Sequence, residues 1–84
     1  MPGELKAYEG TYPLAPTFSL KVFAAEGKLL IQGTSQRAIE VKPVEKDVFV
    51  AESVGAEIDF ERNSSGKVIA LTLKQAGQVL HGER

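Results

Sequence analysis

The feature that most constrains this chain is a turn flanked by two alternating segments. Before the turn, apolar residues alternate with charged ones, and after it they alternate with Ala, Thr and Lys. The turn itself is residues 63–66, Asn-Ser-Ser-Gly, which are residue types that favour tight turns. A period of two on both sides of such a turn predicts a β-hairpin with one buried face and one face in water. The residues expected on the buried face are Ile58, Phe60, Ile69, Leu71 and Leu73.

Turn signals recur about every eight to twelve residues along the chain, a spacing typical of all-β sandwiches and barrels. Strands joined by such short loops must pair antiparallel, because a parallel crossover needs about a dozen residues or more. The sequence therefore predicts an antiparallel meander of seven or eight short strands, rolled into a small barrel or left as a curved sheet. Helix is expected only as one short turn at residues 4–7. The expected strands are 8–14, 18–24, 29–32, 37–42, 48–52, 58–62, 68–75 and 78–81, with Pro13 and Pro16 ending the first and Pro43 ending the fourth.

The apolar residues expected to point inward are bulky enough to fill a barrel of this height. Strands of five to seven residues span about 17–23 Å, and side chains can fill an eight-stranded barrel of that size. We therefore expect a filled core in preference to a ligand cavity. Besides the hairpin residues, the inward set is Phe18, Leu20, Val22, Leu29, Ile31, Ile39, Val41 and Phe49.

Length and charge limit the possible partners. A chain of 84 residues is expected to form one domain over residues 1–84. Ten basic and eleven acidic residues are scattered singly, so no basic stripe predicts binding to nucleic acid. No apolar run approaches the length of about 18–20 residues that a membrane helix needs, so membrane insertion is not expected.

The sequence does not specify a cellular compartment. Cysteine is absent, which fits both a reducing cytosol and a bacterial periplasm. Residues 1–4, Met-Pro-Gly-Glu, have neither a basic nor an apolar character, so no signal peptide is expected there.

Two tyrosines flank a glycine near the start of the chain. In a strand, Tyr8, Gly10 and Tyr12 would share one face, and a tyrosine ring could cover the bare glycine. One interpretation is an aromatic platform for a sugar or a peptide. The favoured interpretation is a first strand that closes the barrel, because buried tyrosines commonly pack with one hydrogen bond.

Three carboxylates would share one strand face. Glu57, Asp59 and Glu61 alternate with core residues, and paired carboxylates can perform acid–base catalysis when a cleft separates their pKa values. Their alternation places them on the face in water, where cross-strand pairing with lysine is the favoured interpretation. The lysines considered as partners are Lys42, Lys67 and Lys74.

Catalytic, cofactor and metal sites are not predicted. His81 is the only histidine, and a metal site needs several converging ligands, so a surface role is expected. No G-x-S-x-G or S-x-x-K motif surrounds any serine, so this chain is not expected to be an enzyme by itself. The serines considered are Ser19, Ser35, Ser53, Ser64 and Ser65.

Several short motifs follow one another in a specific order along nearly the whole chain. They are Tyr8-x-Gly10-x-Tyr12, Gly27-Lys28-Leu29, Pro43 ahead of Phe49, Ile58-Asp59-Phe60-Glu61-Arg62, Gly66-Lys67-Val68, Leu71-x-Leu73-x-Gln75, Gly77 and Arg84. From about Leu5 to Arg84, this order and spacing resembles a bacterial domain family of unknown function. That family is found at the C-terminus of β-lactamase-related serine hydrolases, the class C and penicillin-binding-like group.

The resemblance implies a lipocalin-like or streptavidin-like β-domain that accompanies a catalytic serine hydrolase domain. The implied role is to pack on that domain or to shape access to its active site, in a parent protein that is periplasmic or secreted. The catalytic nucleophile and its lysine would belong to that partner domain. Two alternatives remain open: a stand-alone module that binds a small ligand or peptide, and a structural domain that self-associates through an exposed strand edge.

Overall fold

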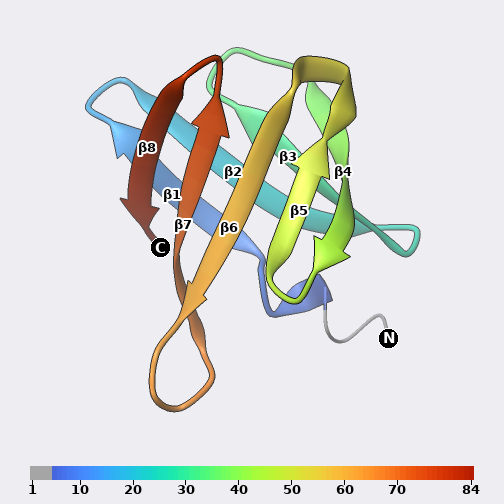
Figure 1. The fold of residues 1–84 in the computed structure, drawn as a ribbon, viewed down its shortest axis with the longest axis vertical. Helices are drawn as coiled ribbons and strands as arrows, with labels where there is room; N and C mark the ends of the chain where they lie inside the picture. Colours follow the sequence, from blue (N-terminus) through green and yellow to red (C-terminus); the bar gives the residue numbers. More distant parts are fainter. Residues whose placement is uncertain (1–4) are drawn as a thin grey trace.

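The computed structural model describes residues 5–84 and shows an antiparallel meander of β-strands (Figure 1). Each strand pairs with the next along the chain, and the last strand contacts the first, so the sheet forms a nearly closed barrel. The predicted all-β meander is therefore confirmed. The elements are β1 (Gly10–Ala15), β2 (Phe18–Ala25), β3 (Lys28–Gly33), β4 (Ala38–Glu45), β5 (Val48–Ala51), the short 3-10 helix η1 (Glu52–Val54), β6 (Ala56–Arg62), β7 (Val68–Gln75) and β8 (Gln78–Glu83).

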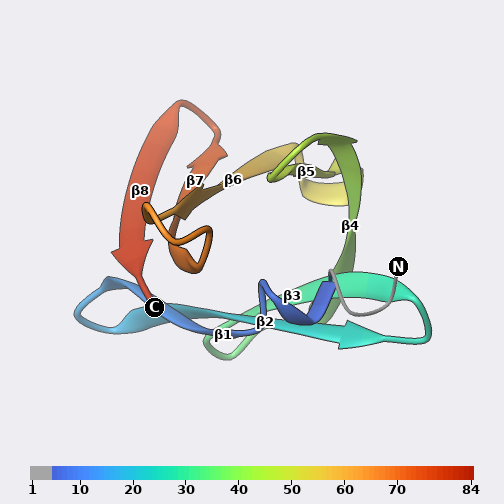
Figure 2. The same ribbon diagram turned by 90° about the horizontal axis from the view of Figure 1, so that it is seen from below.

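The strands form two facing layers. Figure 2 shows β1, β2 and β3 in one layer and β5, β6 and β7 in the other. β4 crosses between the layers on one side, and β8 descends beside β1 on the other. Apolar side chains from both layers fill the space between them, as the alternating pattern predicts. The buried core contains Tyr12, Leu20, Val22, Leu29, Ile31, Val41, Phe49, Ile58, Phe60, Val68, Leu71 and Leu73, with Phe18 and Ile39 half-buried against it.

Two prolines expected to end strands lie inside them. β1 begins at Gly10 and continues through Pro13, and β4 continues through Pro43 to Glu45. Both prolines adjoin a shift in pairing register, between Pro13 and Ala15 and between Pro43 and Glu45. A β-bulge interrupts the ladder of hydrogen bonds, so a residue without an N–H is tolerated there.

Ile69 was expected in the core, but this prediction is wrong. Ile69 is 40% exposed to solvent, whereas the neighbouring Val68 is buried. Glu61 pairs with Ala70 while Arg62 pairs with Val68, so β7 has one extra residue at this point. That extra residue is Ile69, and the bulge turns it outward.

The seam between β1 and β8 depends on a glycine. A Cβ built on Gly82 would collide with the carbonyl oxygen of Pro13, so only glycine allows this approach of the two strands. The N-terminal turn is also partly present, because the amides of Tyr8 and Glu9 donate to the carbonyls of Leu5 and Lys6 at 3.1 and 3.2 Å. The first residue of the turn predicted for residues 4–7 lies outside the described residues.

Candidate functional site

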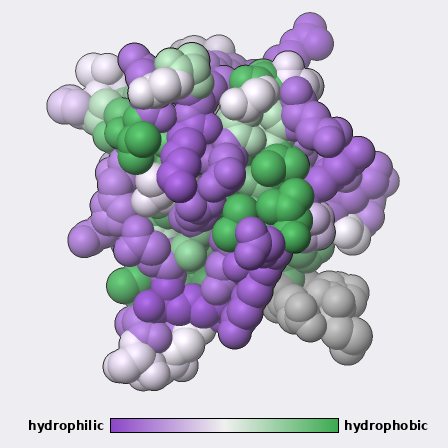
Figure 3. Space-filling model, viewed as in Figure 1, coloured by the Kyte–Doolittle hydropathy of each residue, from purple (hydrophilic) through white to green (hydrophobic). Residues whose placement is uncertain are grey.

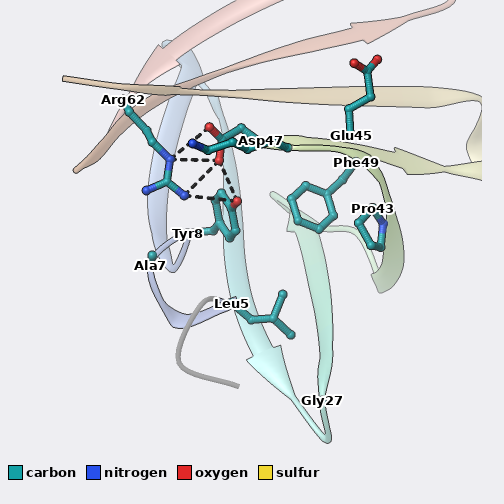
Figure 4. Close-up of a pocket in the computed structure, with 10 residues that line it drawn as sticks. Leu5, Ala7, Tyr8, Gly27, Pro43, Glu45, Asp47, Phe49 and Arg62 are labelled. Carbon is teal, nitrogen blue, oxygen red and sulfur yellow. Dashed lines mark hydrogen bonds and ion pairs between the residues drawn. The ribbon is translucent and has the colours of Figure 1, made fainter. Parts of the chain in front are cut away.

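One end of the barrel carries three polar side chains that come from distant parts of the chain. Tyr8 follows the N-terminal turn, Asp47 lies in the β4–β5 turn, and Arg62 ends β6. Figure 4 shows these three side chains pointing toward one another at the lower end of the barrel in Figure 1. We refer to them as the Tyr8–Asp47–Arg62 cluster.

The carboxylate of Asp47 is the centre of this cluster. Its Oδ1 accepts a hydrogen bond from the Tyr8 hydroxyl at 2.7 Å. The Nε of Arg62 donates to both carboxylate oxygens at 3.0 Å, and its Nη2 lies 2.9 Å from Oδ1. Charge-assisted hydrogen bonds of this kind are stronger than neutral ones. The Asp47 side chain is only 17% exposed, so solvent screens these interactions less than on an open surface.

The backbone holds Asp47 in place. Its φ of +63° lies in the left-handed region, which Asp tolerates better than most residues. Its carbonyl accepts the Phe60 amide at 2.8 Å, which joins the β4–β5 turn to β6. Arg62 is anchored at the far side, because its Nη1 donates to the Gly66 carbonyl at 2.7 Å.

Aromatic rings support the cluster from the core. The Tyr8 ring packs edge-on against Phe49 with centroids 5.1 Å apart, and its centroid lies 4.5 Å from that of Phe60. The Arg62 guanidinium lies 5.5 Å from the centroid of the same Tyr8 ring, within cation–π range. The Tyr12 hydroxyl donates to the Tyr8 carbonyl at 2.7 Å, so both tyrosines have a hydrogen-bond partner.

Electrostatics favour the neutral form of Tyr8 and the charged form of Arg62. Burial raises the pKa of Tyr8, and its hydrogen bond to Asp47 raises it further. Hydrogen bonds to Tyr8 and Asp47 raise the pKa of Arg62. Tyr8 is therefore a neutral donor and Arg62 a cation, and each has partners within the cluster. The geometry indicates a structural connection between three segments. The three residues of the cluster also line an open hollow of about 810 Å³, together with Leu5, Pro43 and Lys46 (Figure 4).

The Tyr-Gly-Tyr motif serves the barrel and presents no aromatic platform. Tyr8 and Tyr12 are both buried. The side chain that covers Gly10 is Arg84 and not a tyrosine ring, since a Cβ on Gly10 would collide with the Arg84 methylenes. The Arg84 Nη1 donates to the carbonyls of Ala7 and Glu9 at 3.0 Å. This contact ties the last residue of the chain to the segment that precedes β1.

The carboxylate row lies on the outer face of β6 and is paired across the sheet. Lys74 Nζ lies 3.6 Å from a Glu57 oxygen and 3.1 Å from Asp59 Oδ2. The hydrogen bond to Asp59 is the main cause of a raised pKa at Lys74. His81 Nε2 lies 2.9 Å from Glu61 Oε2, so the predicted surface histidine is the partner of the third carboxylate.

Of the other lysines considered, Lys42 pairs with Glu52 at 3.8 Å and not with the row. Lys67 forms none of the ion pairs found between residues 5 and 84. Within those residues, no three His, Asp or Glu side chains gather to hold a metal ion. No helix in the same range has the length and apolar character needed to cross a membrane.

The serines are spread over the molecule. Ser19 lies in β2 and its amide donates to the Thr34 hydroxyl at 3.0 Å. Ser53 lies in η1, and Ser35, Ser64 and Ser65 lie in exposed turns. His81 projects from β8 to Glu61, as described above.

The opposite end of the barrel carries an apolar hollow of about 290 Å³, which we call the cup. Its floor consists of buried core residues, and its rim carries polar side chains from the β3–β4 turn and from β7. A filled core was expected from the sequence, and no local motif indicated this cup. The cup is lined by Phe18, Leu20, Ile31, Ile39, Val54, Ala56 and Leu73, with Gln36, Arg37 and Gln75 at the rim.

These observations define a small antiparallel β-barrel domain with a polar cluster beside an open hollow at one end and a smaller apolar cup at the other. The family model described as "Domain of unknown function (DUF3471)" matches residues 2–84, and the chain belongs to this family. The predicted membership of a domain family of unknown function is thus confirmed. Searches of curated proteins and of solved structures found no significant match.

Proposed function

We propose that this chain is a non-catalytic accessory domain that packs against the catalytic domain of a β-lactamase-related serine hydrolase. The motif order described above supports the class of partner. In this proposal the barrel is of the lipocalin-like or streptavidin-like kind, the protein is bacterial, and the catalytic nucleophile belongs to the partner domain.

The observation that carries the docking part of the proposal is an apolar strip on the outer face of the barrel. Val48 and Val50 point outward from β5, and Val44 lies in the adjoining bulge of β4 with 55% of its surface exposed. Outer faces of antiparallel sheets are normally polar. Figure 3 shows hydrophobic colour gathered over β5, with hydrophilic side chains on either side. We call Val44, Val48 and Val50 the valine strip.

Charged residues border the valine strip on both flanking strands. Val50 pairs with Lys42 on one side and with Glu57 on the other. Val48 likewise lies between Glu45 and Asp59. An apolar centre with a charged rim is the arrangement of protein–protein interfaces, where charge is depleted from the core of the contact. A domain that packs on a partner through this strip would keep its charged borders at the edge of the interface.

The first test is the reading frame that contains this segment. A neighbouring domain with an S-x-x-K motif supports the proposal, and a frame that encodes only these residues contradicts the partner assignment. Where the catalytic domain is found, it is produced separately and its binding to this chain is measured by calorimetry. Val50→Lys is expected to weaken binding at least tenfold, because it places a charge at the centre of the contact. Thr11→Lys on the exposed face of β1 is the matched control and should leave binding unchanged.

The non-enzyme part of the proposal has its own test. The purified chain is incubated with a chromogenic lactam or ester, and we expect no turnover above buffer. Turnover that disappears when one of the five serines is replaced would refute this part.

Self-association through a strand edge is a weaker alternative. The two terminal strands, β1 and β8, lie beside each other and cover one another's edges. The close contact of Gly82 with Pro13 leaves little room for an inserted strand between them. Sedimentation of the purified chain as a monomer at high concentration would exclude this alternative, and a dimer would favour it.

A further inference from the structure

We propose that the cup is a binding site for a small organic anion with an apolar body, of which a medium-chain carboxylate is the simplest example. This inference goes beyond the accessory role and does not depend on it, since it concerns only residues of this chain. It rests on the apolar floor of the cup, its size, and the polar groups at its rim.

The floor and walls of the cup are apolar. Leu20, Ile31 and Leu73 form the floor, and each is buried by the barrel around it. Phe18 and Ile39 rise from the floor as half-buried walls. Side chains of this kind favour an apolar ligand over water, because transfer of apolar surface out of water is favourable.

The volume limits the ligand to a small one. At about 290 Å³ the cup is near the lower limit of ligand pockets, which span roughly 300–1,000 Å³. It lies between the β3–β4 turn and η1, at the upper end of the barrel in Figure 1. One short alkyl chain or one aromatic ring fits this space better than a large ligand.

A single cation stands at the rim. Among residues 5–84, Arg37 is the only charged residue that lines the cup. Within residues 5–84, its guanidinium takes part in none of the ion pairs, in contrast to Arg62 at the other end. A planar guanidinium matches the geometry of a carboxylate and can donate two hydrogen bonds to it.

The glutamine side chains near Arg37 have other neighbours. Gln75 Nε2 donates to the Val54 carbonyl at 3.1 Å and is therefore already paired. Gln36 turns its Oε1 over Gly33, where a Cβ would collide with it. The Gln36 carbonyl accepts from Gln32 Nε2 at 3.0 Å, which fixes the backbone next to Arg37. The described residues of the rim thus offer one positive charge and no carboxylate, which favours an anion.

The test is a titration of the ¹⁵N-labelled chain, followed by NMR, with sodium octanoate below its micellar concentration. We expect saturable shifts at the amides of Ile31, Ile39 and Leu73, with a dissociation constant on the order of 1 mM for a ligand of about ten non-hydrogen atoms. Octylammonium, which has the same chain and the opposite charge, should bind at least tenfold more weakly. 1-Octanol should bind with intermediate affinity.

Variants separate the charge from the apolar contact. Arg37→Gln should weaken octanoate binding about threefold to tenfold and leave 1-octanol binding unchanged. Val54→Glu should weaken octanoate binding, and the matched Val54→Lys should strengthen it. Lys46→Gln is the control, because Lys46 lines the hollow at the other end of the barrel.

Three results would overturn the proposal. One is the absence of saturable shifts with octanoate. Another is equal binding of octanoate, 1-octanol and octylammonium, which would remove the role of Arg37. The third is a set of shifts around Lys46 that disappears in Lys46→Gln, which would place the ligand at the opposite end.

Discussion

The two ends of this barrel use polar side chains in opposite ways. At one end, Asp47 brings Tyr8 and Arg62 into a cluster in which each charged or polar group has a partner within 3.0 Å. At the other end, Arg37 borders an apolar cup and takes part in none of the ion pairs between residues 5 and 84. Paired polar groups contribute to stability, and unpaired ones at an apolar rim are suited to binding. The comparison predicts that removal of polar groups destabilises the barrel at the first end and changes mainly binding at the second.

Removal of Asp47 should have the largest effect. Asp47→Ala leaves the Tyr8 hydroxyl and the Arg62 guanidinium without their main partner, and it places a less tolerant residue at a positive φ. We expect a loss of about 2–3 kcal/mol in the free energy of unfolding, below the range for fully buried pairs because both side chains are partly exposed. Urea denaturation measures this loss.

Asp47→Asn is the matched variant. It preserves the preference for the left-handed backbone and removes only the charge, so about half of the loss is expected. If Asp47→Ala changes stability by less than about 0.5 kcal/mol, the cluster does not stabilise this end in the way described.

A substitution at the wall of the cup should cost less. Phe18→Ala removes a half-buried ring that packs over Gly33, and we expect a loss of about 1–2 kcal/mol, less than the 3–5 kcal/mol typical of fully buried phenylalanines. The same urea experiment applies. A loss larger than that of Asp47→Ala would reverse the proposed order of the two ends.

The Tyr8 hydroxyl should contribute about 1 kcal/mol, the usual net value of one hydrogen bond. Tyr8→Phe keeps the ring against Phe49 and Phe60 and removes only the donor to Asp47. Thermal unfolding should show a decrease in Tm of roughly 4–8 °C for a domain of this size. An unchanged Tm would mean that the Asp47–Arg62 pair alone determines stability at this end.

Stability should also fall at alkaline pH. The folded chain holds the pKa of Tyr8 above its ordinary value of about 10, so the unfolded chain loses the phenolic proton first as pH rises. The stabilisation is fully present below pH of about 10 and is lost as pH rises toward the folded pKa. Tyr12, whose pKa burial also raises, adds to this decline. Urea midpoints at several alkaline pH values should fall less steeply for Tyr8→Phe, and parallel profiles would contradict the account.

Replacement of Arg37, the charged residue at the rim of the cup, should have the smallest effect on stability. Arg37→Gln is expected to change the free energy of unfolding by less than about 0.5 kcal/mol, as for exposed residues without special contacts. Arg62→Gln is the matched change at the other end and should be clearly destabilising, since Arg62 bonds Asp47 and Gly66. Equal effects of the two substitutions would remove the distinction between the ends.

Much of the strand pattern was predictable from local sequence. The alternation before and after residues 63–66 placed Ile58, Phe60, Leu71 and Leu73 in the core, and the segment 68–75 coincides with β7. Period-two alternation is a local signal, so it needs no knowledge of tertiary structure. Ile69 escaped prediction because a bulge depends on how two strands pair, which local alternation does not encode.

Neither end of the barrel was predictable in the same way. Tyr8 lies 39 residues from Asp47 and 54 from Arg62, so no local spacing brings them together. The family-like motifs include Tyr8 and Arg62, which was the one available signal, but they do not include Asp47. The cup was missed because its floor consists of ordinary core residues, and the end of a barrel becomes visible only once the strands are placed.

Native-state hydrogen exchange tests the difference between the two ends most directly. At the end with the Tyr8–Asp47–Arg62 cluster, the Tyr8 amide donates to the Leu5 carbonyl and the Phe60 amide donates to the Asp47 carbonyl. At the cup end, the amides of Gln36 and Gly55 donate within exposed turns. We predict that the Tyr8 and Phe60 amides exchange at least about a hundredfold more slowly than those of Gln36 and Gly55, and that Asp47→Asn reduces this difference about tenfold, in line with its expected effect on stability. Equal protection at both ends, or protection at Tyr8 and Phe60 that is unchanged in Asp47→Asn, would contradict the proposed difference between the two ends.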